Sequence, residues 1–177
     1  MINKSKNELS ENFKPNPEFK LEIAQTHEGK TVLKCFQCGM CTSSCPYSEL
    51  LEVKPHQVIR MIHLGMRDQA LTCPTVWVCS TCFMCNERCP QGVELANVMF
   101  ALKNIAAIEK GIPNSLKMLG QSIIKLGRTL EVTEYHDMER LSLGLPKAPT
   151  VNVESVRRLL SKTKFDELVA YWEGKKE

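Results

Sequence analysis

The feature that most constrains this chain is a cysteine motif that occurs twice with the same spacing. The first copy, CFQCGMCTSSCP, runs from Cys35 to Pro46, and the second, CSTCFMCNERCP, runs from Cys79 to Pro90. In each copy two residues separate the first, second and third cysteines, three residues precede the fourth, and a proline follows it. So many thiols in so short a stretch indicate a metal site, provided that the thiols are reduced.

The rest of the sequence supports a reducing compartment. The amino-terminal stretch MINKSKNELSENFKPNPEF is polar and lacks the apolar core of a secretory signal. No apolar run approaches the roughly 18 residues of a membrane-spanning helix. We therefore expect a cytoplasmic protein without a membrane span, where disulfides are rare, and the odd total of nine cysteines could not pair completely. The formal charge of +3 is too small to indicate a nucleic-acid partner.

The motif spacing is that of the bacterial ferredoxins that hold two clusters. In the run C-x2-C-x2-C-x3-C-P, the fourth cysteine ligates the other [4Fe-4S] cluster. Three thiolates on one tight loop can reach three corners of a cubane, whereas the fourth lies beyond the loop. We therefore predict two [4Fe-4S] clusters with crossed ligands. The predicted metal and cofactor-binding residues are Cys35, Cys38, Cys41 and Cys89 for cluster 1, and Cys79, Cys82, Cys85 and Cys45 for cluster 2.

Other assignments of the cysteines and their neighbours are weaker. Structural zinc also uses paired C-x2-C spacing, but two complete copies of the four-cysteine run favour iron–sulfur clusters. Cys73, the ninth cysteine, is interpreted as a small buried hydrophobe, with a regulatory or spare-ligand role as the alternative. We interpret His56 and His63 as surface or packing residues, and Met40 and Met84 as residues that pack over the clusters.

Hydrophobic periodicity outside the motifs predicts helices and no strand. Pro55 and Gly65 bracket a helix between the two motifs. Residues 93–108 predict a strongly apolar helix after the second motif, and Thr133 can open a short helix further on. The other expected helices start at residue 114 and span about residues 152–161 and 164–173.

The predicted fold class is therefore all-α, with an α-helical ferredoxin-type domain that holds the two clusters. An N-terminal arm over residues 1–30 precedes a two-cluster core over residues 31–112. Residues 113–177 form a C-terminal helical extension. Two clusters do not need so long an extension, so we expect it to dock to other subunits.

The layout as a whole resembles the C subunit of the soluble heterodisulfide reductase of methanogenic archaea. The resemblance is carried by CFQCGMCTSSCP, PHQVIRMIHLG, WVCSTCFMCNERCP and the helices that follow, over about residues 30–145, and all eight cysteine positions match. It implies an electron relay between the flavin-containing, electron-bifurcating A subunit and the catalytic B subunit of that enzyme. The catalytic partner reduces the mixed disulfide of coenzyme M and coenzyme B in methanogenesis, and a hydrogenase or formate dehydrogenase module supplies electrons to the flavin-containing partner. The chain itself would have no catalytic residue.

Three alternatives remain open at this point. The chain could be the electron-transfer subunit of another oxidoreductase, such as a succinate/fumarate, glycolate or sulfur-metabolism relative. It could be a helical adaptor held together by zinc. It could also be an oxygen-sensing regulator, although that function needs a DNA-binding element and the sequence contains no suitable basic recognition helix.

Overall fold

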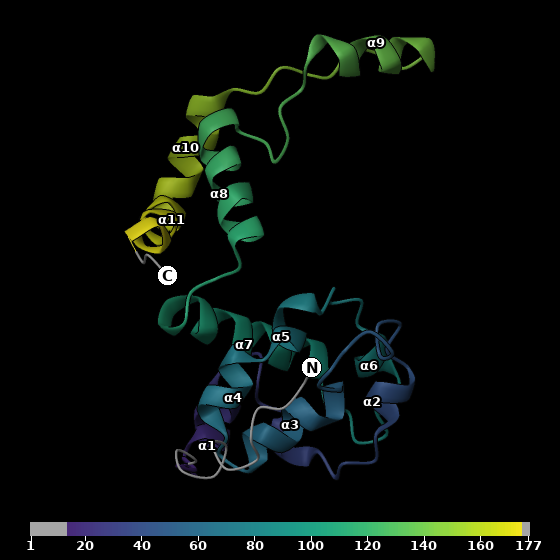
Figure 1. Cartoon of the computed structure of the whole chain (residues 1–177), viewed down its shortest axis with the longest axis vertical. Coiled ribbons are helices and arrows are strands. Elements are labelled where there is room, and N and C mark those ends of the chain that lie inside the picture. Colours follow the sequence, from purple (N-terminus) through teal and green to yellow (C-terminus); the bar gives the residue numbers. More distant parts are fainter. Residues whose placement is uncertain (1–13, 175–177) are drawn as a thin grey trace, which may run out of the picture. The chain divides into compact units, whose positions relative to one another are not determined.

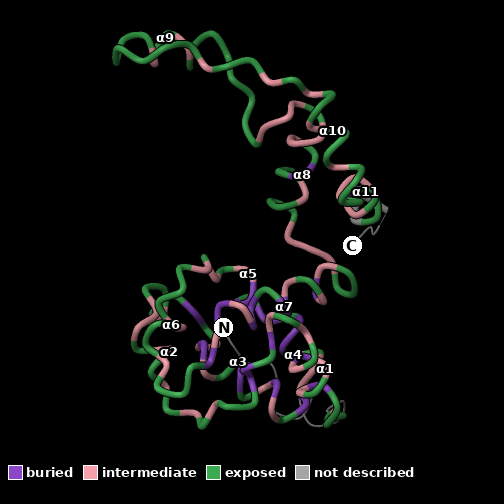
Figure 2. The backbone as a smooth tube through the Cα atoms, turned by 180° about the vertical axis from the view of Figure 1, so that it is seen from behind, coloured by how far each residue is buried: buried purple, intermediate pink, exposed green. Residues whose placement is uncertain are grey.

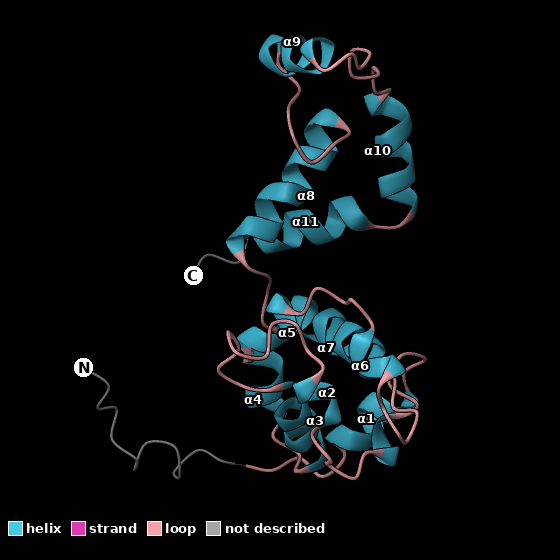
Figure 3. Cartoon of the chain, turned by 90° about the vertical axis from the view of Figure 1, so that its right-hand side faces the viewer, coloured by secondary structure: helices cyan, strands magenta, loops and turns pink. Residues whose placement is uncertain are grey.

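The computed structural model describes residues 14–174, which form helices joined by loops (Figures 1 and 3). Within these residues there is no strand, so the predicted all-α class is confirmed. Part of the predicted N-terminal arm, residues 1–13, lies outside the described residues. The chain divides into two compact units, Met1–Lys110 and Gly111–Glu177. No helix of the described part is both long and apolar enough to cross a membrane.

The first unit contains both cysteine motifs. The long helices predicted between and after the motifs are present as α3 and α7, and shorter helices lie around them. The helices of this unit are α1 (Phe19–Gln25), η1 (Val32–Lys34), α2 (Met40–Ser43), α3 (Pro55–His63), α4 (Arg67–Thr72), α5 (Pro74–Val78), α6 (Met84–Glu87) and α7 (Leu95–Glu109).

The core of the first unit forms around α7, which is apolar on most of its circumference and packs against α1, α4, α5 and α6. Buried positions concentrate in this unit (Figure 2). Phe19 and Ile23 of α1 are fully buried, so residues 19–25 belong to the core although the sequence placed them in the arm. The largest fully buried side chains are Phe19, Ile23, Val32, Val58, Ile59, Ile62, Leu71, Val76, Val98, Met99 and Leu102.

Local sequence explains where α3 begins and ends. Pro55 occupies the first turn, and the side chain of Gln57 accepts a hydrogen bond of 2.7 Å from the backbone N–H of Lys54. After the helix, Gly65 has φ +71° and a carbonyl that accepts from the backbone N–H of Asn16 at 2.8 Å. A Cβ on Gly65 would lie 2.3 Å from the Asn16 carbonyl oxygen, so only glycine fits there.

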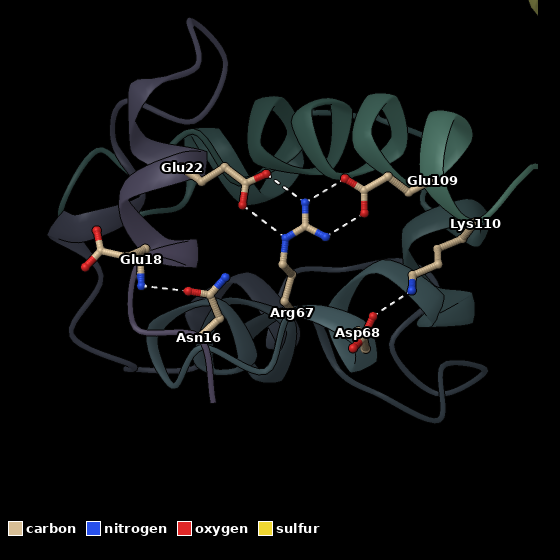
Figure 4. A network of polar contacts seen from close by, with 7 residues as sticks. All are labelled: Asn16, Glu18, Glu22, Arg67, Asp68, Glu109 and Lys110. Carbon is tan, nitrogen blue, oxygen red and sulfur yellow. Dashed lines mark hydrogen bonds and ion pairs between the residues drawn. The ribbon is translucent and has the colours of Figure 1, made fainter. Parts of the chain in front are cut away.

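An arginine joins three helices of the first unit (Figure 4). Arg67, at the start of α4, donates two hydrogen bonds to Glu22 of α1, at 3.1 and 2.8 Å. It also donates two to Glu109 in the last turn of α7, at 2.5 and 2.7 Å. Beside the contact between Arg67 and Glu109, the ammonium of Lys110 lies 2.6 Å from the carboxylate of Asp68. Such two-pronged arginine–carboxylate pairs fix geometry as well as adding attraction, and here they fix α1 and α7 against α4.

The second unit is a small helical group in which α8 (Asn114–Leu126), α10 (Val153–Lys162) and α11 (Phe165–Gly174) pack on one another. These helices agree with those predicted. Gly120 of α8 is buried, and a Cβ there would lie 3.0 Å from the Val169 side chain of α11, so α8 and α11 approach closely at this glycine. Asn152 caps α10 by accepting from the backbone N–H of Ser155 at 3.0 Å.

The remaining helix of the second unit, α9 (Glu134–Ser142), has no buried residue. Thr133 caps it as predicted, through a reciprocal pair of bonds with His136. Its apolar side chains are exposed: Tyr135 by 60 %, Met138 by 62 % and Leu141 by 51 %. The three residues recur at every third position of the helix and so lie near one another along it.

Candidate metal centres

The two cysteine motifs fold in the same way. In each, the first and second cysteines lie on a loop, and the third lies in a one-turn helix, α2 or α6. Two residues of each loop are left-handed: Gln37 (φ 66°) and Gly39 (φ 79°) in the first, and Thr81 (φ 52°) and Phe83 (φ 62°) in the second. Alternating right- and left-handed backbone turns successive N–H groups toward one side and forms a concave anion site. Such a loop suits a negatively charged sulfur-containing group.

Each loop is fixed to the long helix that follows its motif. The residue after the third cysteine, Thr42 or Asn86, accepts a hydrogen bond from the second residue of that helix. His56 N–H of α3 donates to Thr42 Oγ1 at 3.3 Å, and Ala96 N–H of α7 donates to Asn86 Oδ1 at 2.8 Å. These bonds satisfy N–H groups that a helix leaves free in its first turn. The repeated motif is therefore a repeated structure of loop, one-turn helix and long helix.

Two cavities lie against these loops, and each gathers thiols from both motifs. We call them the first and the second cavity, with about 390 and 480 Å³ of space, part of it open to solvent. The first is lined by the first three cysteines of the first motif and the fourth of the second. The second is lined by the first three cysteines of the second motif and the fourth of the first. The cysteines around the first cavity are Cys35, Cys38, Cys41 and Cys89, together with Cys85. Those around the second are Cys79, Cys82, Cys85 and Cys45, together with Cys41.

The third cysteines occupy a special position between the two cavities. Cys41 and Cys85 each line both cavities, and the one-turn helices that carry them, α2 and α6, pack on each other. The second cysteines, Cys38 and Cys82, are in contrast exposed to solvent. Each motif thus has an inner thiol that faces the other motif and an outer thiol at the surface.

Burial and crowding disfavour the bare thiolates at the inner positions. Burial, followed by the neighbouring thiols of Cys35, Cys85 and Cys38, raises the pKa of Cys41 to about 12. Burial and then the thiols of Cys79 and Cys82 raise the pKa of Cys85 to about 11. Bound metal cations reverse this balance, because a coordinated thiol is deprotonated outright. In each cavity, ionisation of the inner thiol is therefore favoured only when a cationic partner is bound beside it.

Three N–H groups donate to thiol sulfurs around the first cavity. The backbone N–H and the side-chain amide of Gln37 both reach the sulfur of Cys35 at 3.4 Å. The backbone N–H of Val93 reaches the sulfur of Cys89 at 3.2 Å. Hydrogen bonds of this kind tune the potential of an iron–sulfur cluster.

The donor set of each cavity fits an iron–sulfur cluster. Soft sulfur ligands from both motifs line each cavity, and the loop N–H groups suit the sulfides of a cubane. In residues 14–174, no three His, Cys, Asp or Glu side chains meet as ligands of a single metal ion.

The structure also places the other residues considered in the sequence. Cys73 is 4 % exposed within the hydrophobic core and lines neither cavity, in agreement with its interpretation as a buried hydrophobe. Met40 lines the first cavity and Met84 the second. His63 is a packing residue that contacts the Val32 carbonyl at 3.0 Å.

Sequence reasoning missed three residues that shape the cavities. His56 was interpreted as a surface or packing residue, but it lines the first cavity, with its Nδ1 2.7 Å from Thr42 Oγ1. The paired roles of Thr42 and Asn86 were also missed. Their signal was visible in the repeat, because both copies have a hydrogen-bonding side chain directly after the third cysteine.

Comparison with known proteins agrees with this site. A 4Fe-4S dicluster domain matches residues 31–93, which include all eight cysteines of the two motifs. This match favours [4Fe-4S] clusters over zinc, and the number of two is consistent with a dicluster domain.

Relatives with curated names extend the similarity to most of the chain. The C subunit of H2:CoB–CoM heterodisulfide,ferredoxin reductase from Methanothermobacter marburgensis is 33 % identical over 82 % of this chain and 82 % of its own. The iron–sulfur C 2 subunit of CoB–CoM heterodisulfide reductase from Methanocaldococcus jannaschii is 34 % identical over 81 % of both chains. The C2 subunit of H2/formate:CoB–CoM heterodisulfide,ferredoxin reductase from Methanococcus maripaludis is 32 % identical over 93 % of this chain and 89 % of its own.

These relatives are subunits of an oxidoreductase, and the similarity covers the cysteine motifs together with most of the helices that follow. The chain belongs to the family of iron–sulfur proteins that form the C subunit of heterodisulfide reductase.

Proposed function

We propose that this chain carries single electrons through a heterodisulfide reductase, from a bifurcating flavoprotein partner to a catalytic partner that reduces the disulfide of coenzyme M and coenzyme B. The observation that carries the proposal is the pair of cavities, each lined by three cysteines of one motif and the fourth of the other. Two [4Fe-4S] clusters in these cavities would supply one-electron redox chemistry. The contribution of the chain is to hold two such centres close together.

The ligand assignment is part of the proposal, and it is supported by the cysteine spacing and by the thiols of both motifs that line each cavity. We assign Cys35, Cys38, Cys41 and Cys89 to cluster 1, and Cys79, Cys82, Cys85 and Cys45 to cluster 2.

The exposure of the thiols suggests a route through the chain. Electron transfer over a long distance is slow because tunnelling weakens steeply with separation. Cys41 and Cys85 line both cavities, so they would connect the two centres. Cys38 and Cys82 are exposed, and partner centres can approach most closely there. Electrons would therefore enter beside one outer thiol, cross at the inner thiols and leave beside the other outer thiol.

The second unit supports a role in assembly. Its helix α9 exposes Tyr135, Met138 and Leu141, and the flanking Leu130 and Leu143 are exposed by 74 and 76 %. Exposed apolar side chains gathered along one segment are typical of a protein–protein contact. We propose that the helical extension, residues 113–177, docks to the partner subunits in the cytoplasm.

The proposal is tested by purification of the native protein without oxygen. The expected result is about eight irons per chain, two reducible clusters by EPR, and co-purification with a flavoprotein and a second iron–sulfur protein. A chain that binds zinc, or one that purifies with a dehydrogenase and a membrane anchor, would refute the respective part of the proposal.

A further inference from the structure

The two cavities are near copies of each other, so the positions at which they differ determine how their contents differ. When the motifs are aligned by their cysteines, Gln37 corresponds to Thr81. His56 corresponds to Ala96, because each donates its backbone N–H to the residue after the third cysteine. At both positions the first copy has a side chain with nitrogen atoms and the second copy does not.

Gln37 makes a direct contact that Thr81 does not reproduce. Its side-chain amide and its backbone N–H both donate to the Cys35 sulfur at 3.4 Å. Within residues 14–174, no backbone or side-chain N–H donates to the corresponding sulfur of Cys79 at hydrogen-bonding distance. Thr81 has a left-handed backbone like Gln37, with φ 52° against 66°, but in the described part of the chain its backbone N–H makes no equivalent bond to sulfur. The two loops therefore differ here in the side chain and in the reach of the backbone N–H.

Two further contacts act in the same direction. The backbone N–H of Val93 donates to the Cys89 sulfur at 3.2 Å, which adds a third N–H to the thiols of the first cavity. Around the second cavity, the backbone N–H of Ala96 donates to Asn86 Oδ1 at 2.8 Å and also contributes a hydrogen bond to the Cys85 thiol. The first cavity has three N–H groups that donate to thiol sulfur at the distances given above. The first set of thiols therefore receives more hydrogen-bond donation than the second.

His56 adds a polar ring to the first cavity, where the second cavity has only the methyl group of Ala96. The Oγ1 of Thr42 accepts from the backbone N–H of His56 and also hydrogen-bonds with the ring Nδ1 at 2.7 Å, so both contacts hold the ring in place. A polar group in a cavity wall stabilises negative charge better than a methyl group does.

One cation acts in the opposite direction. The ammonium of Lys103 donates to the carbonyl oxygen of Cys79 at 2.9 Å and lies 5.7 Å from the Phe100 ring. It contacts a backbone carbonyl and not a sulfur, and it is half-buried. The ranking therefore rests on the three N–H groups that contact sulfur directly in the first cavity.

We propose that the cluster held by Cys35, Cys38, Cys41 and Cys89 has the higher reduction potential of the two, and that Gln37 is a positioning residue that sets this order. The inference rests on the proposed function, because it requires two clusters. Reduction adds negative charge, and hydrogen-bond donors to sulfur stabilise the reduced form, so they raise the potential.

The ranking gives the relay a direction. With both clusters bound, one electron would pass from the cluster held by Cys79, Cys82, Cys85 and Cys45, which would be oxidised, to the cluster held by Cys35, Cys38, Cys41 and Cys89, which would be reduced. No bond is formed or broken and no proton moves. A one-electron donor in the partner complex accordingly docks at the side of Cys82, and the acceptor docks at the side of Cys38.

The experiment is an anaerobic redox titration of the full chain, followed by EPR, with side chains exchanged between the two loops. Gln37→Thr places in the first loop the residue that the second loop already accommodates in the same left-handed conformation. We expect this substitution to lower the reduction potential of the higher-potential cluster by up to about 59 mV. A shift of that size is a change of about tenfold in the one-electron equilibrium constant. The reverse exchange, Thr81→Gln, should raise the potential of the lower-potential cluster.

A matched control separates the hydrogen bond from general polarity. Gln91 also lines the first cavity, but within the described residues it makes no hydrogen bond to a thiol. Gln91→Thr should therefore leave both potentials unchanged. Iron content, measured for every variant, shows whether both clusters are present.

The outcomes are distinct. If Gln37→Thr shifts the lower-potential cluster or neither cluster, or if Gln91→Thr produces the same shift, the ranking is wrong. If the Gln37→Thr variant loses a cluster, the Thr81→Gln variant alone provides the test. In that case, a lower-potential cluster whose reduction potential is unchanged in Thr81→Gln overturns the inference. If the unaltered chain holds fewer than two clusters, the proposed function itself fails.

Discussion

Asn86 Oδ1 accepts a hydrogen bond of 2.8 Å from the backbone N–H of Ala96, and this contact fixes the loop of the second motif to the start of α7. Thr42 and His56 make the equivalent contact in the first motif, at 3.3 Å. In both cases the bond connects a residue beside an inner cysteine to the helix that lines the core. The position of each inner thiol therefore depends on a side chain that is not a ligand.

Asn86→Ala should destabilise the second motif more than the first. Loss of a side chain that caps a helix costs about 1 kcal/mol, so the variant should unfold at lower temperature and release iron sooner from the second site. Circular dichroism and the rate of iron release to a chelator measure the two effects. Asn86→Asp keeps the acceptor oxygen and serves as the control; equal loss from both variants would show that the bond is unimportant.

Exchange of the fourth cysteines tests the crossed ligation. Cys89→Ser should impair the cluster held by Cys35, Cys38 and Cys41, because Cys89 lines the first cavity with them. Cys45→Ser should impair the other cluster, since Cys45 lines the second cavity. EPR of the reduced variants identifies the cluster that is altered. Impairment of the cluster within the same motif in each case would contradict the assignment.

Cys73→Ser should leave the iron content unchanged. Cys73 is almost fully buried in the hydrophobic core, and a hydroxyl buried there without a partner costs about 1–3 kcal/mol of stability. The expected result is a lower unfolding temperature with both clusters retained. Cys73→Ala, which introduces no hydroxyl, is the control, and loss of one cluster's iron from both variants would make Cys73 a ligand.

Gly65→Ala should destabilise the first unit strongly. The new Cβ would lie 2.3 Å from the Asn16 carbonyl oxygen, and the backbone is left-handed at φ +71°. The left-handed conformation alone costs about 1–2 kcal/mol for an L-residue, and the clash adds to it. Gly92→Ala has φ +60° but no atom within 4 Å of the new Cβ, so it should cost only the backbone term. Thermal unfolding compares them, and equal losses would exclude a role for the Asn16 contact.

Glu109→Gln should reduce stability in a pH-dependent way. The hydrogen bonds from Arg67 hold the pKa of Glu109 below its usual value of 4.5, so the ionised carboxylate stabilises the folded chain above that value. The contribution is lost as the pH falls through the lowered pKa. At pH 7 the free energy of unfolding of Glu109→Gln should be lower than that of the unaltered chain by about 0.5 kcal/mol, allowing for solvent screening. This gap should shrink in acid.

Urea unfolding of both proteins at several pH values measures this gap. The control is Asp68→Asn, whose carboxylate pairs with Lys110 but is far more exposed, so its effect should be smaller. A gap that is unchanged in acid would show that the charge of Glu109 is not its cause.

The sequence alone predicted the parts of this structure that follow from spacing and periodicity. Pro55 marked the start of α3 correctly, and Thr133 marked the start of α9. The one-turn helices α2 and α6 could not be predicted, because four residues are too few to show a helical period.

The backbone of the loops was also beyond local rules. Gly39 is a natural left-handed residue, but Phe83 takes the same conformation at the equivalent position, against its own preference. In the same way, the sequence placed Phe19 and Ile23 in the N-terminal arm. In the structure both side chains are fully buried, because α1 packs against α3 and α7. Long-range packing therefore decided the features that the sequence analysis missed.

The ion pairs of Arg67 have a consequence for how the chain is made. Glu109 and Lys110 are the last residues of the first unit, and their partners Arg67 and Asp68 lie in its middle. During synthesis on the ribosome, α1 and α4 emerge well before Glu109, whose carboxylate completes the ion pairs of Arg67. The first unit can thus be locked only when its final helical turn has left the ribosome, and by then all eight motif cysteines have emerged as well.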